Sequence, residues 1–156
     1  MTIPFVVAII LFIINSGAYI VPPQAGVSPF TLESAYIGVT KTAEPAGPFQ
    51  NGDLPINITY TIEVSAKKGT LTNISFDYIC EVIKDGPAPD CPPITPDIPS
   101  PPPFISPVEP FTFSYTYRNP ISGSSFYDSF VVDTFTVTAD APEKAGDKAA
   151  SSVSIK

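Results

Sequence analysis

Two segments of the chain, residues 55–65 and 110–118, alternate between apolar and polar residues with a period of two. Side chains of a β-strand point alternately to its two faces, so each segment predicts a strand with one face in a core and the other toward solvent. The predicted inward-facing residues are Ile56, Ile58, Tyr60, Ile62 and Val64 in the first segment, and Phe111, Phe113, Tyr115 and Tyr117 in the second.

Weaker alternation predicts further strands along the chain. These strands are residues 36–43, 71–79, 126–139 and 149–155, of which the third is long enough for a bulge. The glycine-containing turn at 66–70 is expected to join its neighbouring strands as a hairpin, and residues 44–55 and 140–148 are rich in turn-forming residues. Six or seven short strands separated by turns predict an all-β fold, an immunoglobulin-like antiparallel sandwich over residues 36–156.

The N-terminal residues 1–21 are apolar, and no charged side chain precedes Glu33. The stretch is nearly long enough to cross a bilayer as a helix, and it also has the apolar core and small-residue cleavage site of a signal peptide. A third possibility is that it is the end of a longer membrane-inserted chain. We therefore expect a helical membrane segment, with residues 3–21 contacting the membrane and residues 22–35 forming an extended spacer.

Residues 80–110 contain both cysteines, Cys80 and Cys91, and eleven of the twenty prolines. Two cysteines without any histidine cannot complete a zinc site, and ten intervening residues do not fit a redox Cys-x-x-Cys pair. In an exported chain we expect a structural disulfide between them. About three strands lie on each side of this run, too few on either side for a sandwich, so we expect an intradomain crossover.

Composition narrows the function classes. The net charge of −7, with eight Lys and Arg residues, disfavours nucleic-acid binding, which depends on cationic side chains that neutralise phosphates. The absence of histidine removes the commonest metal ligand and the usual general base. No serine lies in a Gly-x-Ser-x-Gly elbow. We therefore expect no catalytic residues, no cofactor and no metal site, and a protein that is not an enzyme.

Several sequence segments resemble the immunoglobulin-like repeat domain of unknown function that is found in secreted and surface proteins of bacteria and archaea. They are "IGVTKTAEPAG", "NGDLPINITYTIEVS", "GTLTNISFDY" and "DTFTVTADAPEKAGDKAASSVSI", which together span roughly residues 36–156. The resemblance implies a surface-displayed structural or adhesive module without catalytic residues. The insertion rich in cysteine and proline departs from the family pattern.

Lys41, on the first predicted strand, is a candidate for a covalent crosslink. Some surface pilins resemble this pattern and join such a lysine to an Asn or Asp of the last strand by an isopeptide bond. The last predicted strand, "AASSVSIK", contains neither residue, so we expect Lys41 to be a solvated lysine.

Other polar residues are candidate ligands or modification sites. Clustered loop carboxylates can bind calcium, but their spacing alone favours solvated turn residues. The residues concerned are Asp140, Glu143 and Asp147 in one loop and Asp85 and Asp90 in another. Asn57 and Asn73 match the N-glycosylation pattern on outward-facing positions, as alternating strands also do by chance.

These observations predict a non-catalytic structural or adhesive module at the cell surface or secreted, anchored or exported by its N-terminal segment. Other surface modules or copies of the chain itself are the candidate partners. One alternative is a pilin-like subunit of an extracellular filament, packed through its N-terminal apolar helix. The other is a module that binds a carbohydrate or a peptide.

Overall fold

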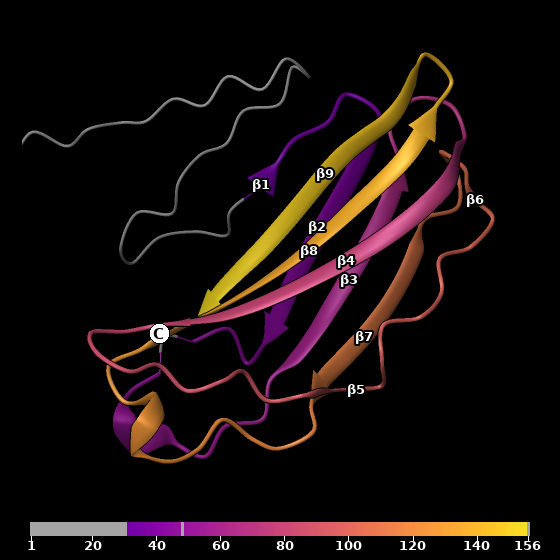
Figure 1. The fold of residues 1–156 in the computed structure, drawn as a ribbon. Helices are drawn as coiled ribbons and strands as arrows, with labels where there is room; N and C mark the ends of the chain where they lie inside the picture. Colours follow the sequence, from indigo (N-terminus) through magenta and orange to yellow (C-terminus); the bar gives the residue numbers. More distant parts are fainter. Residues whose placement is uncertain (1–30, 48, 156) are drawn as a thin grey trace, which may run out of the picture.

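The computed structural model describes residues 31–47 and 49–155, which form two antiparallel sheets packed face to face (Figure 1). One sheet has the order β1-β9-β8-β4-β6 and the other β2-β3-β7-β5. The strands are β1 Thr31–Leu32, β2 Ile37–Glu44, β3 Thr59–Ala66, β4 Leu71–Ile83, β5 Ile94–Thr95, β6 Phe104–Ile105, β7 Phe111–Tyr117, β8 Phe130–Ala141 and β9 Lys144–Ile155. Two short 3₁₀ helices, η1 Asn51–Asp53 and η2 Ser124–Phe126, lie at one end. The predicted all-β class is confirmed.

The membrane segment expected at residues 1–21 lies outside the described residues. Within the part of the chain that the structure describes, no helix is long and apolar enough to cross a bilayer. Thr31 and Leu32, at the end of the range expected as a spacer, pair as β1 with Ser151 and Ala150 of β9.

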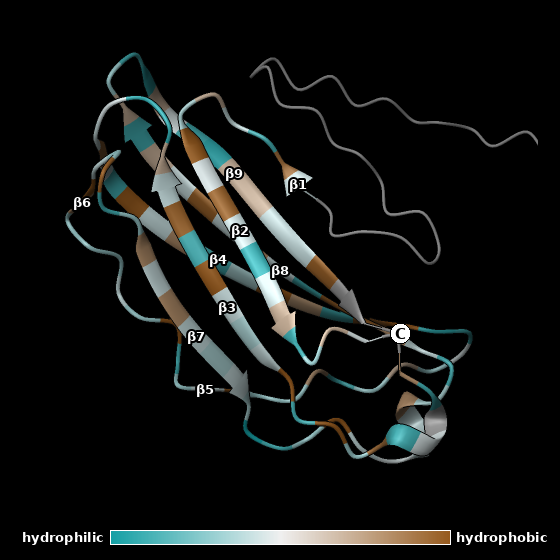
Figure 2. Cartoon of the chain, turned by 180° about the vertical axis from the view of Figure 1, so that it is seen from behind, coloured by the Kyte–Doolittle hydropathy of each residue, from teal (hydrophilic) through white to brown (hydrophobic). Residues whose placement is uncertain are grey.

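The core lies between the sheets and is built from the alternating residues of both. In β3 the residues Tyr60, Ile62 and Val64 are fully buried, while Thr59 and Glu63 are exposed. Figure 2 shows the same alternation as brown and pale or teal bands along the strands. The inward-facing sets predicted for β3 and β7 are confirmed, with the two phenylalanines of β7 half-buried at the margin. Burial of these apolar faces is the main favourable contribution to folding.

The hairpin predicted between β3 and β4 is wrong. The two strands belong to different sheets, and the turn at 67–70 carries the chain across the core. A strand pair facing each other across a sandwich shows the same alternation as a hairpin, so the pattern could not separate the two. Gly69 in this turn has φ +68, and a Cβ there would lie 2.5 Å from Pro142 of the β8–β9 connection. Glycine is therefore required both by backbone conformation and by close packing.

The last strand is also longer than expected. Residues 144–148, assigned to a turn from their glycine and charges, belong to β9, and the β8–β9 hairpin turns at Pro142 and Glu143. The register of this hairpin shifts between Ala139 and Ala141, which is the irregularity of a β-bulge. Long-range pairing with β8 outweighed the local turn preference of "EKAGDK".

The proline-rich run joins both sheets. After β4 it contributes β5, which pairs with the end of β7 in one sheet, and then β6, which pairs with the start of β4 in the other (Figure 1). The predicted disulfide between Cys80 and Cys91 is present, with Cα atoms 6.1 Å apart. It ties the C-terminal part of β4 to the segment just before β5.

Replacing both cysteines by serine should lower the free energy of unfolding by about 2 to 3 kcal/mol, because the unfolded chain then loses a short closed loop. Urea unfolding of the double variant against the oxidised wild type measures the difference. Wild type unfolded in the presence of reductant is the matched control and should show the same loss. Equal stability of the oxidised and reduced proteins would contradict the prediction.

Candidate functional site

A charged pair lies in the centre of the sandwich. Lys41 of β2 and Asp133 of β8 come from different sheets, and the Lys41 Nζ atom is in direct contact with Asp133 Oδ1. Neither side chain is exposed to solvent. The expectation that Lys41 is solvated is wrong.

The register of the two strands explains this burial. In β2, residues 37, 39, 41 and 43 share the inner face, so Lys41 lies in line with Ile37 and Val39. In β8, Asp133 lies between Val131 and Phe135 on the buried face. Each charge therefore occupies a position whose neighbours on the same face are apolar.

Three tyrosine hydroxyls donate hydrogen bonds to the carboxylate of Asp133. Tyr115 donates to Oδ1 at 2.6 Å, and Tyr117 and Tyr78 each donate to Oδ2 at 3.0 Å. Tyr115 also accepts a hydrogen bond from Lys41 Nζ at 2.8 Å. Both carboxylate oxygens thus have two donors, which offsets much of the cost of removing the charge from water.

Aromatic rings surround the amine of Lys41. Its Nζ lies 4.6 Å from the ring centroid of Tyr60 and 5.4 Å from that of Tyr115. The Tyr60 hydroxyl is 3.3 Å from that of Tyr117. Lys41, Asp133, Tyr60, Tyr78, Tyr115 and Tyr117 form what we call the core charge cluster. It draws one residue or more from each of β2, β3, β4, β7 and β8.

The electrostatics of the cluster follow from its burial. Desolvation lowers the pKa of Lys41 to about 6, because the ammonium has lost its water. Burial raises the pKa of the four tyrosines, chiefly because a phenolate would be poorly solvated there. The hydroxyls therefore remain protonated donors at neutral pH.

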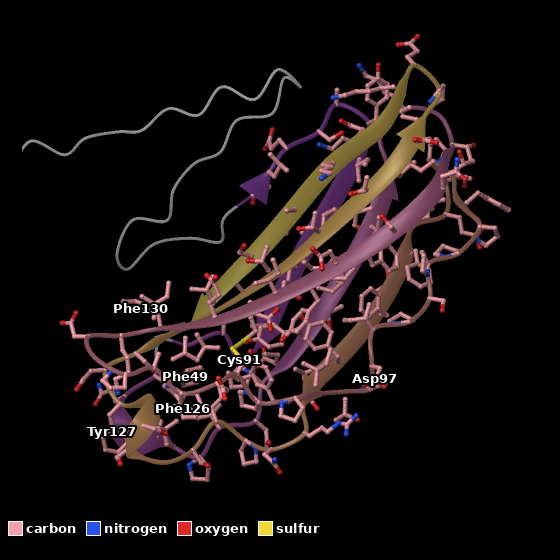
Figure 3. All side chains as sticks on the ribbon, viewed as in Figure 1. Phe49, Cys91, Asp97, Phe126, Tyr127 and Phe130 are labelled. Atoms are coloured by element: carbon pink, nitrogen blue, oxygen red, sulfur yellow. A yellow bond between two sulfur atoms is a disulfide. The ribbon has the colours of Figure 1, made fainter. Side chains whose placement is uncertain are left out.

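The disulfide lies against this cluster. Cys80 Sγ is 3.5 Å from the Tyr117 hydroxyl. In Figure 3 the yellow sulfur bond beside Cys91 lies below the C-terminal part of β4, toward the end of the molecule that carries η1 and η2. The covalent link and the buried charges thus reinforce one region of the core.

The three candidate calcium ligands Asp140, Glu143 and Asp147 each have partners of their own. Asp140 accepts from Asn73 and from the Gly146 amide, while the Tyr36 hydroxyl donates to Glu143. Asp147 pairs with Lys144 at 2.7 Å and accepts from Ser34. Among the described residues, no group of three or more acidic, cysteine or histidine side chains is arranged to hold a metal ion.

The two glycosylation patterns lie on the outer surface, as expected. Asn57 and Asn73 are both exposed. The Asn73 side-chain amide donates to Asp140 at 2.7 Å, so its nitrogen is engaged in the β4–β8 bulge.

An apolar pocket of about 270 Å³ opens at the end of the sandwich that carries η1 and η2. Figure 3 shows Phe49 and Phe126 at this end, with Tyr127 beside them. Its apolar lining residues are Phe49, Leu54, Ile56, Ile58, Ile121, Phe126 and Val131. None of its lining residues belongs to the core charge cluster. The period-two pattern gave no signal of the pocket, because its walls come partly from loops.

Comparisons with protein-family models, with curated proteins and with solved structures found no match to this chain.

Replacing Tyr117 by phenylalanine should lower the free energy of unfolding by about 1 to 3 kcal/mol, because a buried carboxylate loses one of its donors. Urea unfolding monitored by circular dichroism measures the change. Tyr127→Phe is the matched control, since its ring is 40% exposed and it lies outside the cluster. A Tyr117→Phe protein as stable as this control would show that the hydrogen bond has no net value.

Proposed function

We propose that the chain is an immunoglobulin-like structural module, displayed at the cell surface or secreted, with a mechanical or adhesive role. The arrangement of strands supports the immunoglobulin-like assignment. In constant-type immunoglobulin domains the strands A, B, E and D face the strands C, F and G. Here β2-β3-β7-β5 faces β9-β8-β4, which is the same order with β1 and β6 added to the second sheet.

One observation carries the structural role: the sheets are joined through the core charge cluster, beside a disulfide. Antibody domains link their sheets by a disulfide between strands B and F. In this protein the strand equivalent to F carries Asp133, and its partner across the core is Lys41. The disulfide instead fastens the proline-rich run to β4. The core charge cluster holds the two sheets together, and the disulfide holds the proline-rich segment against β4.

The disulfide also supports an exported location. Structural disulfides persist in oxidising compartments and are uncommon in the reducing cytosol. The apolar residues 1–21 are the feature of the sequence that would direct export. Residues 3–21, which are proposed to contact the membrane, lie outside the residues that the structure describes. The filament alternative depends on the same residues.

An apolar pocket favours a second candidate function, the binding of a peptide. Its volume of about 270 Å³ suits one or two apolar side chains, and its lining offers few polar groups for sugar hydroxyls. Between the two ligands considered from the sequence, this lining favours an apolar peptide over a carbohydrate.

Expression of the full chain in a bacterium with an export pathway tests the surface role. The protein should be recovered from the envelope or the medium with Cys80 and Cys91 oxidised, as measured by thiol alkylation and mass spectrometry. A chain without residues 1–30 is the control and should remain in the cytosol. Full-length protein found in the cytosol with free thiols would contradict the proposal, and regular fibres in electron micrographs of the exported material would favour the filament alternative.

The pocket is tested with two neighbouring substitutions. If it binds apolar peptides, Phe126→Ala should weaken binding at least tenfold in a peptide array followed by fluorescence titration. Tyr127→Ala, beside it but outside the lining, should leave binding unchanged. No binding by wild type, or equal loss in both variants, would exclude the pocket as the peptide site.

A further inference from the structure

The core charge cluster has the features of a reaction centre as well as of an ion pair. An amine and a carboxyl group are held in contact, and both are fully buried. They are fixed on β2 and β8, whose backbones are set by pairing with β3 and with β4 and β9. Reacting groups held in this way gain an effective molarity of about 10⁵ to 10⁸ M over the same groups free in water.

We propose that Lys41 and Asp133 condense into an intramolecular isopeptide bond between Lys41 Nζ and Asp133 Cγ, with release of one water. The inference is independent of the surface role proposed above. It places a covalent crosslink between the two sheets, from β2 to β8.

The protonation states favour the reaction. Burial lowers the pKa of Lys41 to about 6, so its ammonium loses a proton near neutral pH, and the carboxylate of Asp133 is the group in contact that can accept it. The products of that transfer are a neutral amine, which is a nucleophile, and a carboxylic acid, which is a better electrophile than its anion. A low-dielectric site favours this neutral pair, since ion pairs there have lost their hydration.

The hydrogen bonds assign distinct roles to the tyrosines. Tyr117 and Tyr78 donate to Oδ2, where negative charge develops when the amine adds to Cγ, and so act as an oxyanion hole. Tyr115 accepts from Nζ and donates to Oδ1, so its hydroxyl can relay a proton from the nitrogen to the departing oxygen.

The step balances without any other reactant. The Nζ–Cγ bond forms and the Cγ–Oδ1 bond breaks. Two protons, the one first passed from the ammonium and the one relayed through Tyr115, leave with Oδ1 as water, and nothing is oxidised or reduced. In bulk water hydrolysis would oppose the amide, but a site fully closed to solvent supplies little water for the reverse reaction.

Intact-mass spectrometry of the folded, purified full chain, measured after reduction and denaturation, tests the bond. Wild type should be lighter by one water than expected from the mass of Asp133→Ala prepared in the same way, after allowance for the substitution. This comparison cancels any processing of the N-terminus. Masses that differ by the substitution alone would overturn the proposal.

Peptide mapping of wild type gives a second readout that needs no variant to fold. Trypsin should fail to cut after Lys41, and the peptide ending at Lys67 should be joined to residues 119–144. Recovery of the free peptide 42–67 in full yield would overturn the proposal.

Two further variants test the chemistry. Asp133→Asn keeps the carbonyl carbon and releases ammonia, so its linked peptide should have the same mass as that of wild type. In cell-free synthesis under oxidising conditions, Tyr115→Phe should slow bond formation at least tenfold. Tyr60→Phe is the control within the cluster, since that hydroxyl contacts Tyr117 and not the carboxylate. Equal rates in the two variants would exclude the relay through Tyr115.

Discussion

The contact between Lys41 and Asp133 is the constraint on which the rest of the core depends. A buried charge is costly unless it is paired and hydrogen-bonded, so the surroundings must supply donors in fixed places. Tyrosine meets this requirement because it fills a core with an aromatic ring and still delivers a hydroxyl. Tyr78, Tyr115 and Tyr117 donate to the carboxylate in this way, and the hydroxyl of Tyr60 joins the cluster through that of Tyr117. The register of five strands is thereby fixed around one carboxylate.

Much of the fold could be predicted because the strands alternate with little ambiguity. Tyr60 and Ile62 of β3 and Tyr115 of β7 were placed on the core face from period two alone. The pairing of β3 with β7 instead of β4 could not be predicted, since both arrangements present the same faces to the core. Similarly, "EKAGDK" has the local composition of a turn, and its place in β9 depends on long-range pairing with β8.

The candidate site was missed, although the sequence carried a signal. Lys41 and Asp133 each occupy an inward position in an alternating strand, where a charge requires a partner. The pilin pattern places the partner of such a lysine on the last strand, whereas here Asp133 lies on the strand before it. A lysine and an aspartate at inward positions of two predicted strands are a sequence signal for a buried ion pair. The tyrosine hydrogen bonds could not be foreseen, because they depend on how the two sheets face each other.

The two-residue strands β5 and β6 determine how the molecule can meet its neighbours. They place the proline-rich run beside β7 and β4, and nine prolines between residues 92 and 110 remove the amide donors that an incoming strand would need. This side of the sandwich is therefore a poor template for edge-to-edge aggregation. Within the described residues, the opposite side presents the long strands β2 and β9, with β9 covered by β1 at two positions. Edge-to-edge pairing would consequently use one side of each module, so it would join two modules face to face at that side and would not continue into a longer chain.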